Sequence, residues 1–336
     1  MMRGVLAAFL GAILVLTVSG CPEPEVPQVE PRDFRQDMRE FVQRIGQYAK
    51  ARKADTIVIA QNGQDLLTTD GKAEGPWATV YADALDGIGR EDVYYGFYGD
   101  NVATPKEERD NLLAFLDRAE ANGVEALVTD YCRSLDKILL SYSECHKRGF
   151  ISFQADHREL DNVPAYPPVA FNVNSHNVDS LADACNFLYL INPGEFPSKE
   201  AYLETLGDAR HDLLIIDLFY EDEALSAQDV AGLRVKPQGG DRLVIAYLSI
   251  GEAEEYRYYW GVGWKPGNPG WVVAENPEWD GNYIVKYWDE AWQALILGDA
   301  NAYLDRILAA GFDGIYLDII DAFEYFEAID YVEDDE

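Results

Sequence analysis

The feature that most constrains the fold is the alternation of short apolar runs with amphipathic helical patterns along most of the chain. Strands that alternate with helices predict a parallel sheet, and eight such units in about 300 residues predict a closed (β/α)8 TIM barrel of the α/β class. The predicted strands are Thr56–Asn62, one within Asp83–Tyr95, Glu125–Asp130, Phe150–Asp156, Asn186–Asn192, Leu213–Asp217, one beginning at Leu243, and Gly314–Asp318. The predicted helices are Lys106–Asn122, Ser134–Arg148, Ser198–Asp208, Ser226–Leu233 and Glu290–Ala310.

The order of these units predicts how the barrel closes. No helix of ordinary length follows the last predicted strand, but an amphipathic helix over Asp33–Lys53 precedes the first one. We expect this N-terminal helix to lie beside the last strand and to close the ring, with Phe41 and Ile45 packed beside Gly314–Ile320. Chain ends can lie at many surface positions of a barrel, so this arrangement is compatible with the fold.

Several predicted strands end in a carboxylate or an amide, and the carboxyl ends of barrel strands share one face. The stretch Leu243–Trp260 is the most informative of them. A buried apolar run breaks at Gly251 into Glu252, Glu254 and Glu255, which Arg257 and several aromatic residues follow. Carboxylates set among aromatic rings at the end of a buried strand suit proton transfer beside a sugar ring.

The N-terminal residues predict export. Arg3 precedes an apolar run that is too short to span a bilayer comfortably, and small residues stand directly before Cys21. This pattern resembles a bacterial lipobox, so residues 1–20 are predicted to be a lipoprotein signal peptide and Cys21 the lipidated residue. An ordinary signal peptide is the alternative. Residues 21–32 are predicted to be a stiff, acidic tether, and residues 33–330 the barrel domain.

Charge and cysteine content exclude several classes of function. Sixty acidic and 27 basic residues give a formal net charge of −33, which disfavours nucleic acid as a partner. The charge fits either a generally acidic surface or a cleft for a cationic ligand. The three other cysteines and the four histidines lack ligand spacing, so neither a metal nor an organic cofactor is predicted. We expect a monomer.

Five blocks stand out in the second half of the chain: Asp212–Phe219, Ser249–Arg257, Glu275–Trp279, Gly281–Trp288 and Gly311–Tyr325. In combination they resemble the signature blocks of glycoside hydrolase family 114, the endo-α-1,4-polygalactosaminidase-like proteins. The first half, at Ile59–Gly63, Leu85–Glu91 and Val128–Cys132, resembles segments that usually follow the last of these blocks. The resemblance therefore implies a circularly permuted barrel, with the former ends joined within Leu160–Val178.

Asp217 and Glu254 are the predicted catalytic residues. Asp217 ends an apolar strand, and the resemblance implies that Glu254 takes part in proton transfer. Glu252 could serve instead of Glu254, whereas Glu255 is expected to point outward or to pair with Arg257. Asp318 could contact substrate, or it could orient Arg257 or a loop backbone. The full set of predicted substrate-binding residues is Asp318, Glu252, Arg257, Tyr220, Tyr256, Trp260, Trp288, Asp289, Asp130 and Asn62.

Together these observations predict a lipid-anchored, extracytoplasmic glycoside hydrolase that cleaves a polysaccharide. The resemblance implies the substrate class, a galactosamine-containing polymer. The residues alone predict only a carbohydrate-active barrel with a carboxylate-lined cleft. A non-catalytic polysaccharide-binding lipoprotein on the same barrel is the alternative, and a solute-binding lipoprotein fits the anchor but not the barrel pattern.

Overall fold

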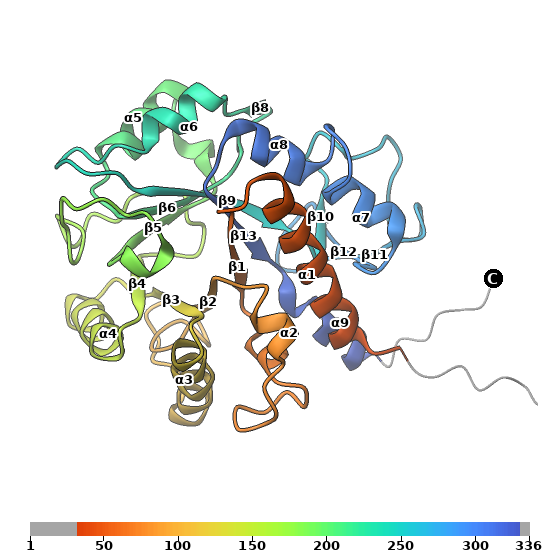
Figure 1. The fold of residues 1–336 in the computed structure, drawn as a ribbon, viewed down its shortest axis with the longest axis horizontal. Coiled ribbons are helices and arrows are strands. Elements are labelled where there is room, and N and C mark those ends of the chain that lie inside the picture. The colour runs from red at the N-terminus through yellow and green to blue at the C-terminus, as the bar shows by residue number, and fades with distance from the viewer. Residues whose placement is uncertain (1–31, 330–336) are drawn as a thin grey trace, which may run out of the picture. The chain divides into compact units, whose positions relative to one another are not determined.

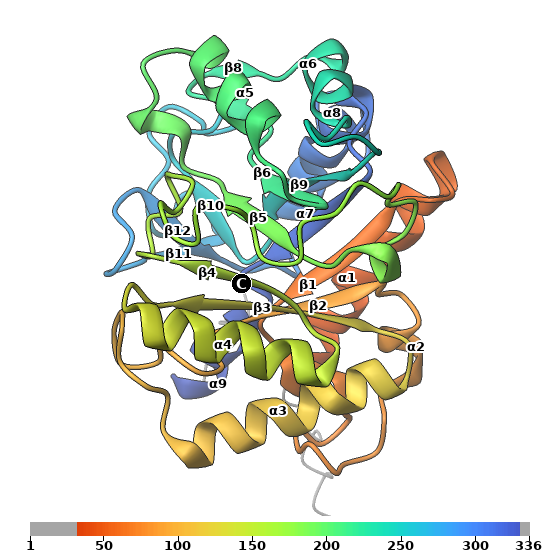
Figure 2. The ribbon, with the colours of Figure 1, turned by 90° about the vertical axis from the view of Figure 1, so that its left-hand side faces the viewer.

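Eight parallel strands form the central sheet of the computed structural model, which describes residues 32–329 (Figures 1 and 2). Neighbouring strands follow the order β4-β3-β2-β1-β13-β9-β6-β5. The two end strands meet at Phe153 of β4 and Phe187 of β5, whose ring centroids are 5.7 Å apart. The nearly closed sheet confirms the predicted (β/α)8 class. The strands are β1 (Ile57–Gln61), β2 (Gly87–Glu91), β3 (Glu125–Tyr131), β4 (Ile151–Ala155), β5 (Phe187–Leu190), β6 (Leu213–Ile216), β9 (Leu243–Ser249) and β13 (Gly314–Asp318).

Helices cover the outside of the sheet (Figure 2). Their apolar faces pack on strands that are buried along almost their whole length, which is the pattern of a parallel sheet covered by helices. The α-helices are α1 (Phe34–Arg52), α2 (Thr79–Ala82), α3 (Lys106–Ala121), α4 (Leu135–Arg148), α5 (Lys199–Asp208), α6 (Ala227–Leu233), α7 (Glu290–Ile296), α8 (Tyr303–Ala310) and α9 (Phe323–Ala328). Short 3-10 helices are η1 (Gln64–Leu67), η2 (Leu181–Asp183), η3 (Pro193–Glu195) and η4 (Ile320–Ala322).

Helix α1 occupies the position predicted for it, against the first and last strands (Figure 1). Strands β1 and β13 pair in parallel although they lie at opposite ends of the chain. At the C-terminal end of α1, Lys53 Nζ donates a hydrogen bond to the carbonyl oxygen of Phe312, two residues before β13, at 2.9 Å. Tyr48 on α1 donates to Asp305 of α8 at 2.8 Å. The α1 residues Phe41 and Ile45 are fully buried.

Two departures from the predicted elements concern the second half of the chain. The helix predicted over Glu290–Ala310 is two helices, α7 and α8, because the chain turns at Gly298, where φ is 145°. A glycine adopts this conformation at little cost. The structure also contains a small antiparallel sheet that the sequence did not predict. It consists of β10 (Glu252–Glu254), β12 (Asn282–Val285) and β11 (Val272–Glu275), while β7 (Phe219–Tyr220) pairs with β8 (Glu223–Ala224).

The predicted signal peptide, the lipidation site Cys21 and nearly all of the tether lie outside the described residues. Within residues 32–329, no helix is both long and apolar enough to cross a membrane.

The position of α1 generates a test of barrel closure. Replacing Ile45 with Ala leaves a cavity between α1 and the sheet, and we expect the free energy of unfolding to fall by about 2–5 kcal/mol. Gln47→Ala, on the exposed side of the same helix, is the control and should change it by no more than about 0.5 kcal/mol. Urea unfolding followed by circular dichroism measures both. Equal effects of the two variants would contradict the packing of α1 on the barrel.

Candidate active site

A cavity of about 460 Å³ lies beside the carboxyl ends of the strands. Strand ends around the barrel contribute to its lining, from Gln61 at the end of β1 and Glu91 at the end of β2 to Asp318 at the end of β13. This end of a (β/α)8 barrel is where active sites are built. The cavity, called the cleft below, is strongly acidic, since its lining includes two guanidinium groups, Arg158 and Arg257, and seven carboxyl groups: Glu91, Asp217, Glu221, Glu252, Glu254, Asp318 and Asp321.

Three neighbouring strands bring the predicted acids together. Asp217 directly follows β6, Glu252 and Glu254 lie just after β9, and Asp318 ends β13. Both glutamates can face the cleft because they are two residues apart on the short strand β10, where alternate side chains share a face. Gly251 allows the tight turn between β9 and β10. A Cβ atom there would lie 2.2 Å from the carbonyl oxygen of Ile319.

Arg257 binds both predicted catalytic carboxylates at once. Its Nη1 and Nη2 atoms donate to Asp217 at 2.9 and 2.5 Å, and its Nε atom donates to Glu254 at 2.7 Å. Tyr256 donates a further hydrogen bond to Glu254 at 2.7 Å. All three charged groups are buried. Burial raises the pKa of Asp217, and Arg257 opposes that rise. The pair of carboxylates is therefore held together by a shared cation.

Glu252 and Asp318 have no such cation within residues 32–329, and both hold protons more strongly than an ordinary carboxyl group. Burial raises the pKa of Glu252 to about 7, and burial together with the nearby Glu91 carboxylate raises the pKa of Asp318 to about 8. Both oxygens of Asp318 accept hydrogen bonds, from Tyr247 at 2.6 Å and from the backbone N–H of Ile319 at 2.8 Å. Glu252 accepts one at Oε1, from Asn276 at 2.8 Å, and no hydrogen bond from a described residue reaches its Oε2 atom.

These contacts decide between the alternatives for two of the acids. Asp318 does not orient Arg257, because Arg257 donates to Asp217 and Glu254. Glu255 is exposed and accepts a hydrogen bond from Tyr283 at 3.2 Å. It therefore points outward, the first of the two predicted alternatives, and does not pair with Arg257.

The wall opposite Asp217 offers hydrogen-bond acceptors. Asn62 donates to Glu91 at 3.2 Å, and Tyr131 also donates to that carboxylate. The side-chain oxygens of Gln61 and Asn282, which both line the cleft, are buried and have no hydrogen-bond partner among the described residues. Buried polar atoms normally find a partner, so these two oxygens suit a ligand that brings hydroxyl or ammonium donors.

Of the predicted site residues, Asp217, Glu252, Glu254, Tyr256, Arg257, Asp318 and Asn62 line the cleft. The other five do not. Asp130 precedes Tyr131, a cleft residue on the same strand, so Asp130 faces the opposite side of the sheet, where Ser141 and two backbone N–H groups donate to it. Asp289 caps the N-terminus of α7.

The three remaining aromatic residues are packing residues in the structure. Tyr220 is buried and donates to the carbonyl oxygen of Phe196 at 2.7 Å. Trp260 stacks on Tyr283 with centroids 4.7 Å apart, and Trp288 packs on the ring of Phe326, also at 4.7 Å.

Trp279 and Glu91 line the cleft but were not predicted as site residues. Trp279 is 44% exposed, and an exposed indole at a cleft rim suits stacking on a sugar ring. Its place depends on the hairpin between β11 and β12, which the sequence did not reveal. Glu91 was harder to detect, because the prediction gave only a strand within Asp83–Tyr95, and the structure shows that this strand ends at Glu91.

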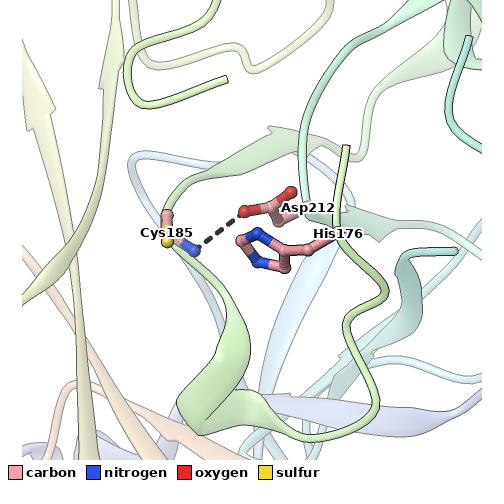
Figure 3. Close-up of side chains that lie close together, drawn as sticks. All are labelled: His176, Cys185 and Asp212. Carbon is pink, nitrogen blue, oxygen red and sulfur yellow. Dashed lines mark hydrogen bonds between the residues drawn. The ribbon is translucent and has the colours of Figure 1, made fainter. Parts of the chain in front are cut away.

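One cluster outside the cleft has metal-ligand residue types, and Figure 3 shows it: His176, Cys185 and Asp212. The carboxylate of Asp212 is already fully engaged. Its Oδ1 atom lies 2.8 Å from the buried ammonium group of Lys236, and its Oδ2 atom accepts from Asn174 at 2.7 Å and from the backbone N–H of Cys185 at 3.0 Å. A metal ion would have to compete with this ammonium group, so the cluster is a structural one.

A parallel barrel whose strand ends present paired carboxyl groups and a rim tryptophan to one cleft has the arrangement that glycoside hydrolases use. Comparison with known proteins agrees with this class. Residues 196–335 match the model of glycoside-hydrolase family GH114. The predicted resemblance to this family is confirmed over that segment.

Three relatives are similar to parts of the chain. An uncharacterized protein of Deinococcus radiodurans is 49% identical over 122 residues, which cover 36% of this chain and 37% of that protein. An uncharacterized protein of Methanocaldococcus jannaschii is 35% identical over 189 residues, 55% of this chain and 51% of that protein. One from Thermotoga maritima is 49% identical over 82 residues, 24% of each chain. The matches thus span about a quarter to a half of the relatives' lengths.

The raised pKa of Asp318 predicts a pH-dependent stability difference. An aspartate in an unfolded chain has a pKa of about 3.9, so between that value and about 8 the folded state binds the extra proton. The stability that this proton contributes is complete below the lower pKa and is lost as the pH rises through the higher one. Asp318→Asn cannot ionise, so its stability relative to wild type should increase between pH 6 and pH 9.

Urea unfolding at the two pH values measures this change. Asp280→Asn, at an exposed position, is the control and should show no pH-dependent difference from wild type. A stability difference for Asp318→Asn that is the same at pH 6 and pH 9 would contradict a protonated Asp318.

Proposed function

We propose that the protein is a glycoside hydrolase that cleaves a galactosamine-containing polysaccharide, as endo-α-1,4-polygalactosaminidases do, by carboxylate acid/base catalysis. The observation that carries this proposal is the division of the carboxyl groups in one cleft into two kinds. Asp217 and Glu254 share a buried guanidinium, whereas Glu252 and Asp318 favour the protonated state near neutral pH. Hydrolysis of a glycosidic bond needs one carboxylic acid and one carboxylate.

Asp217 and Glu254 are the proposed catalytic carboxylates. Arg257 compensates their charge and fixes their positions, so one of them can act as nucleophile or general base without reorientation. The Nη2 atom of Arg257 donates hydrogen bonds to one oxygen of Asp217 at 2.5 Å and to one oxygen of Glu254 at 3.2 Å. These two oxygens are therefore at most 5.7 Å apart, the sum of the two distances. The guanidinium lies between them, so a sugar cannot lie directly between these two groups.

The proton donor is therefore a different carboxyl group, and Glu252 fits best. A general acid works best when its pKa is close to the working pH, and that of Glu252 is about 7. Its Oε2 atom has no hydrogen bond from a described residue, so a proton there can be donated into the cleft. Both oxygens of Asp318 already accept hydrogen bonds, which makes it the second candidate.

An amino sugar suits the part of the cleft that is formed by the ends of β1, β2 and β13. The carboxyl groups of Glu91 and Asp318 and the unpaired oxygen of Gln61 come from the ends of the adjacent strands β2, β13 and β1. All three groups can accept hydrogen bonds, and Asn62 and Tyr131 already donate to Glu91. An ammonium group offers three donors and a positive charge, so it would satisfy this wall better than a neutral hydroxyl group.

The main test is cleavage of polygalactosamine by nearly isosteric variants. Glu254→Gln and Asp217→Asn should each retain the fold and lose cleavage by a factor of about 10²–10⁴. Glu252→Gln should lose cleavage of the polymer to a similar extent but retain most of its activity on an aryl galactosaminide, whose leaving group needs no protonation. Product analysis and release of the aryl group measure these activities. Glu255→Gln, outside the cleft, is the matched control.

The outcomes separate the competing assignments. Full polymer cleavage by both Glu254→Gln and Asp217→Asn would exclude them as catalytic residues, and loss of aryl galactosaminide cleavage in Glu252→Gln would exclude it as the acid. If wild type binds the polymer but cleaves none between pH 4 and pH 9, the protein is a polysaccharide-binding protein instead. Binding of the deacetylated polymer should weaken with added salt more than binding of an acetylated one, because only the former is cationic.

The lipid anchor and the circular permutation also remain proposals. Cys21 is the proposed lipidation site, which would hold an exported barrel at a membrane surface. Cys21→Ser should release the protein into the soluble fraction of the host cells, because the acyl chains supply the attachment. Fractionation followed by immunoblotting measures this, with Cys185→Ser as the control. Unchanged partitioning of Cys21→Ser would count against the anchor.

A further inference from the structure

The connection between β4 and β5 is unlike the others in the barrel. Every other pair of consecutive barrel strands is joined through at least one α-helix, but residues 156–186 contain only the short 3-10 helix η2. An irregular, proline-rich segment takes the place of a helix there. It leaves a second cavity of about 360 Å³, called the seam pocket below, between residues 163–170, helix α4, strand β4 and residues 208–211.

The seam pocket and the cleft lie at opposite ends of the same strand. His211, which lines the seam pocket, precedes β6, and Asp217, which lines the cleft, follows it. The two cavities share no lining residue. A ligand in the seam pocket therefore does not occupy the cleft.

Part of the lining of the seam pocket consists of rings. Tyr142 of α4, Phe153 of β4 and Tyr166 contribute aromatic rings, and Pro164 and Pro167 contribute aliphatic ones. Phe171 stacks on Tyr142 with centroids 4.5 Å apart, which fixes the segment against α4. Rings beside a few polar groups suit a ring-shaped ligand with apolar faces.

One residue that lines this pocket, Gln154, carries a hydrogen-bond acceptor whose orientation is fixed. The Nε2 atom of Gln154 donates to Ser141 Oγ at 2.8 Å, and that hydroxyl group donates in turn to Asp130. Because the hydroxyl proton is used in this way, Ser141 can only accept from Gln154, and the orientation of the amide is determined. The Oε1 atom of Gln154 therefore has no hydrogen-bond partner among the described residues. The residue is only 1% exposed.

A second unpartnered group lines the same pocket. The Nδ1 atom of His211 is buried and has no hydrogen-bond partner within residues 32–329. Burial, together with the nearby Arg242 guanidinium, lowers the pKa of His211 to about 4, so the imidazole is neutral at physiological pH. Two buried, unpaired polar atoms in one cavity are costly unless a ligand or water satisfies them.

The charges around the pocket favour an uncharged ligand. Asp208 and Arg210, which both line it, have opposite charges. Arg242 donates to the carbonyl oxygens of Leu206 and Ala209 directly beneath this segment, at 2.9 and 2.5 Å, and its positive charge disfavours a cation at His211. The neutral imidazole, in turn, gives an anion no charged partner.

We propose that the seam pocket binds one neutral sugar ring, with a hydroxyl group donating to Gln154 Oε1 and another paired with His211. The choice of a sugar among hydroxyl-bearing rings rests on the proposed function. The pocket itself stands on the two unpaired polar atoms and the aromatic walls. It would hold a second stretch of a partly acetylated polymer away from the cleft.

The test is an NMR titration of the purified protein with N-acetylgalactosamine, observed at the imidazole signals of its four histidines. We expect saturable shifts of the His211 signals in wild type and in Asp217→Asn. Ala165→Trp fills the pocket from its exposed segment and should weaken this binding at least tenfold, whereas Ala165→Ser should not. Cationic galactosamine should bind the pocket more weakly than the neutral sugar.

Absence of His211 shifts with N-acetylgalactosamine, or unchanged shifts in Ala165→Trp, would overturn the proposal. Tighter binding of galactosamine at this site would overturn the choice of a neutral ligand. The result is independent of catalysis. If the His211 signals shift in a protein that cleaves no polymer, the proposed sugar site in the seam pocket is supported although the proposed enzymatic function is wrong. If the protein cleaves the polymer but the His211 signals do not shift, the sugar site is wrong and the enzymatic function is unaffected.

Discussion

The buried guanidinium of Arg257 is the interaction on which the geometry of the cleft depends. It joins the end of β6 to the segment after β9 through four hydrogen bonds to two carboxylates. The rings of Phe219, Tyr256 and Tyr303 surround it, with centroids 5.1–5.6 Å from its central carbon. Taking one cation and two anions out of water is costly, and the closely spaced hydrogen bonds and the aromatic rings offset that cost. Loss of one partner of such a pair typically costs about 3–5 kcal/mol.

The opposite end of the barrel depends on a different buried pair. Lys236 and Asp212 have fully buried side chains, and Lys236 also donates to Asn174 and to the carbonyl oxygen of His176. These contacts attach residues 174–177 to the start of β6, beside the connection that lacks a helix. The Arg257–Asp217 ion pair thus orders the carboxyl end of β6. The Lys236–Asp212 ion pair orders its amino end, next to the connection between β4 and β5 that lacks an α-helix.

Most of the fold could be predicted from the sequence because barrel strands are buried on both faces and read as continuous apolar runs. The cleft acids could be predicted for the same reason, since Asp217 and Asp318 stand at the ends of such runs. What could not be predicted depends on contacts between distant segments. The place of Trp279 follows from the β11–β12 hairpin, and the break between α7 and α8 follows from a single glycine conformation.

Asp130 shows why a strand-end acid need not belong to a cleft. Its position relative to Tyr131 turns it outward, where the backbone N–H groups of Tyr94 and Tyr95 require an acceptor. A shift by one residue along a strand exchanges the two faces of the sheet. The alternation of side chains, rather than the residue type alone, therefore separates cleft carboxylates from structural ones.

The pairing of β1 with β13 has a consequence for how the chain folds during synthesis. Ile57 is aligned with Gly314, so this edge of the first strand stays without its partner until the chain has been made as far as residue 314. Contacts between such distant segments form slowly, because a long loop must close before they contribute stability. Because β13 pairs with β1 on one side and with β9 on the other, the sheet cannot be completed before β13 has been made. Insertion of this one strand joins the N-terminal and C-terminal parts of the barrel.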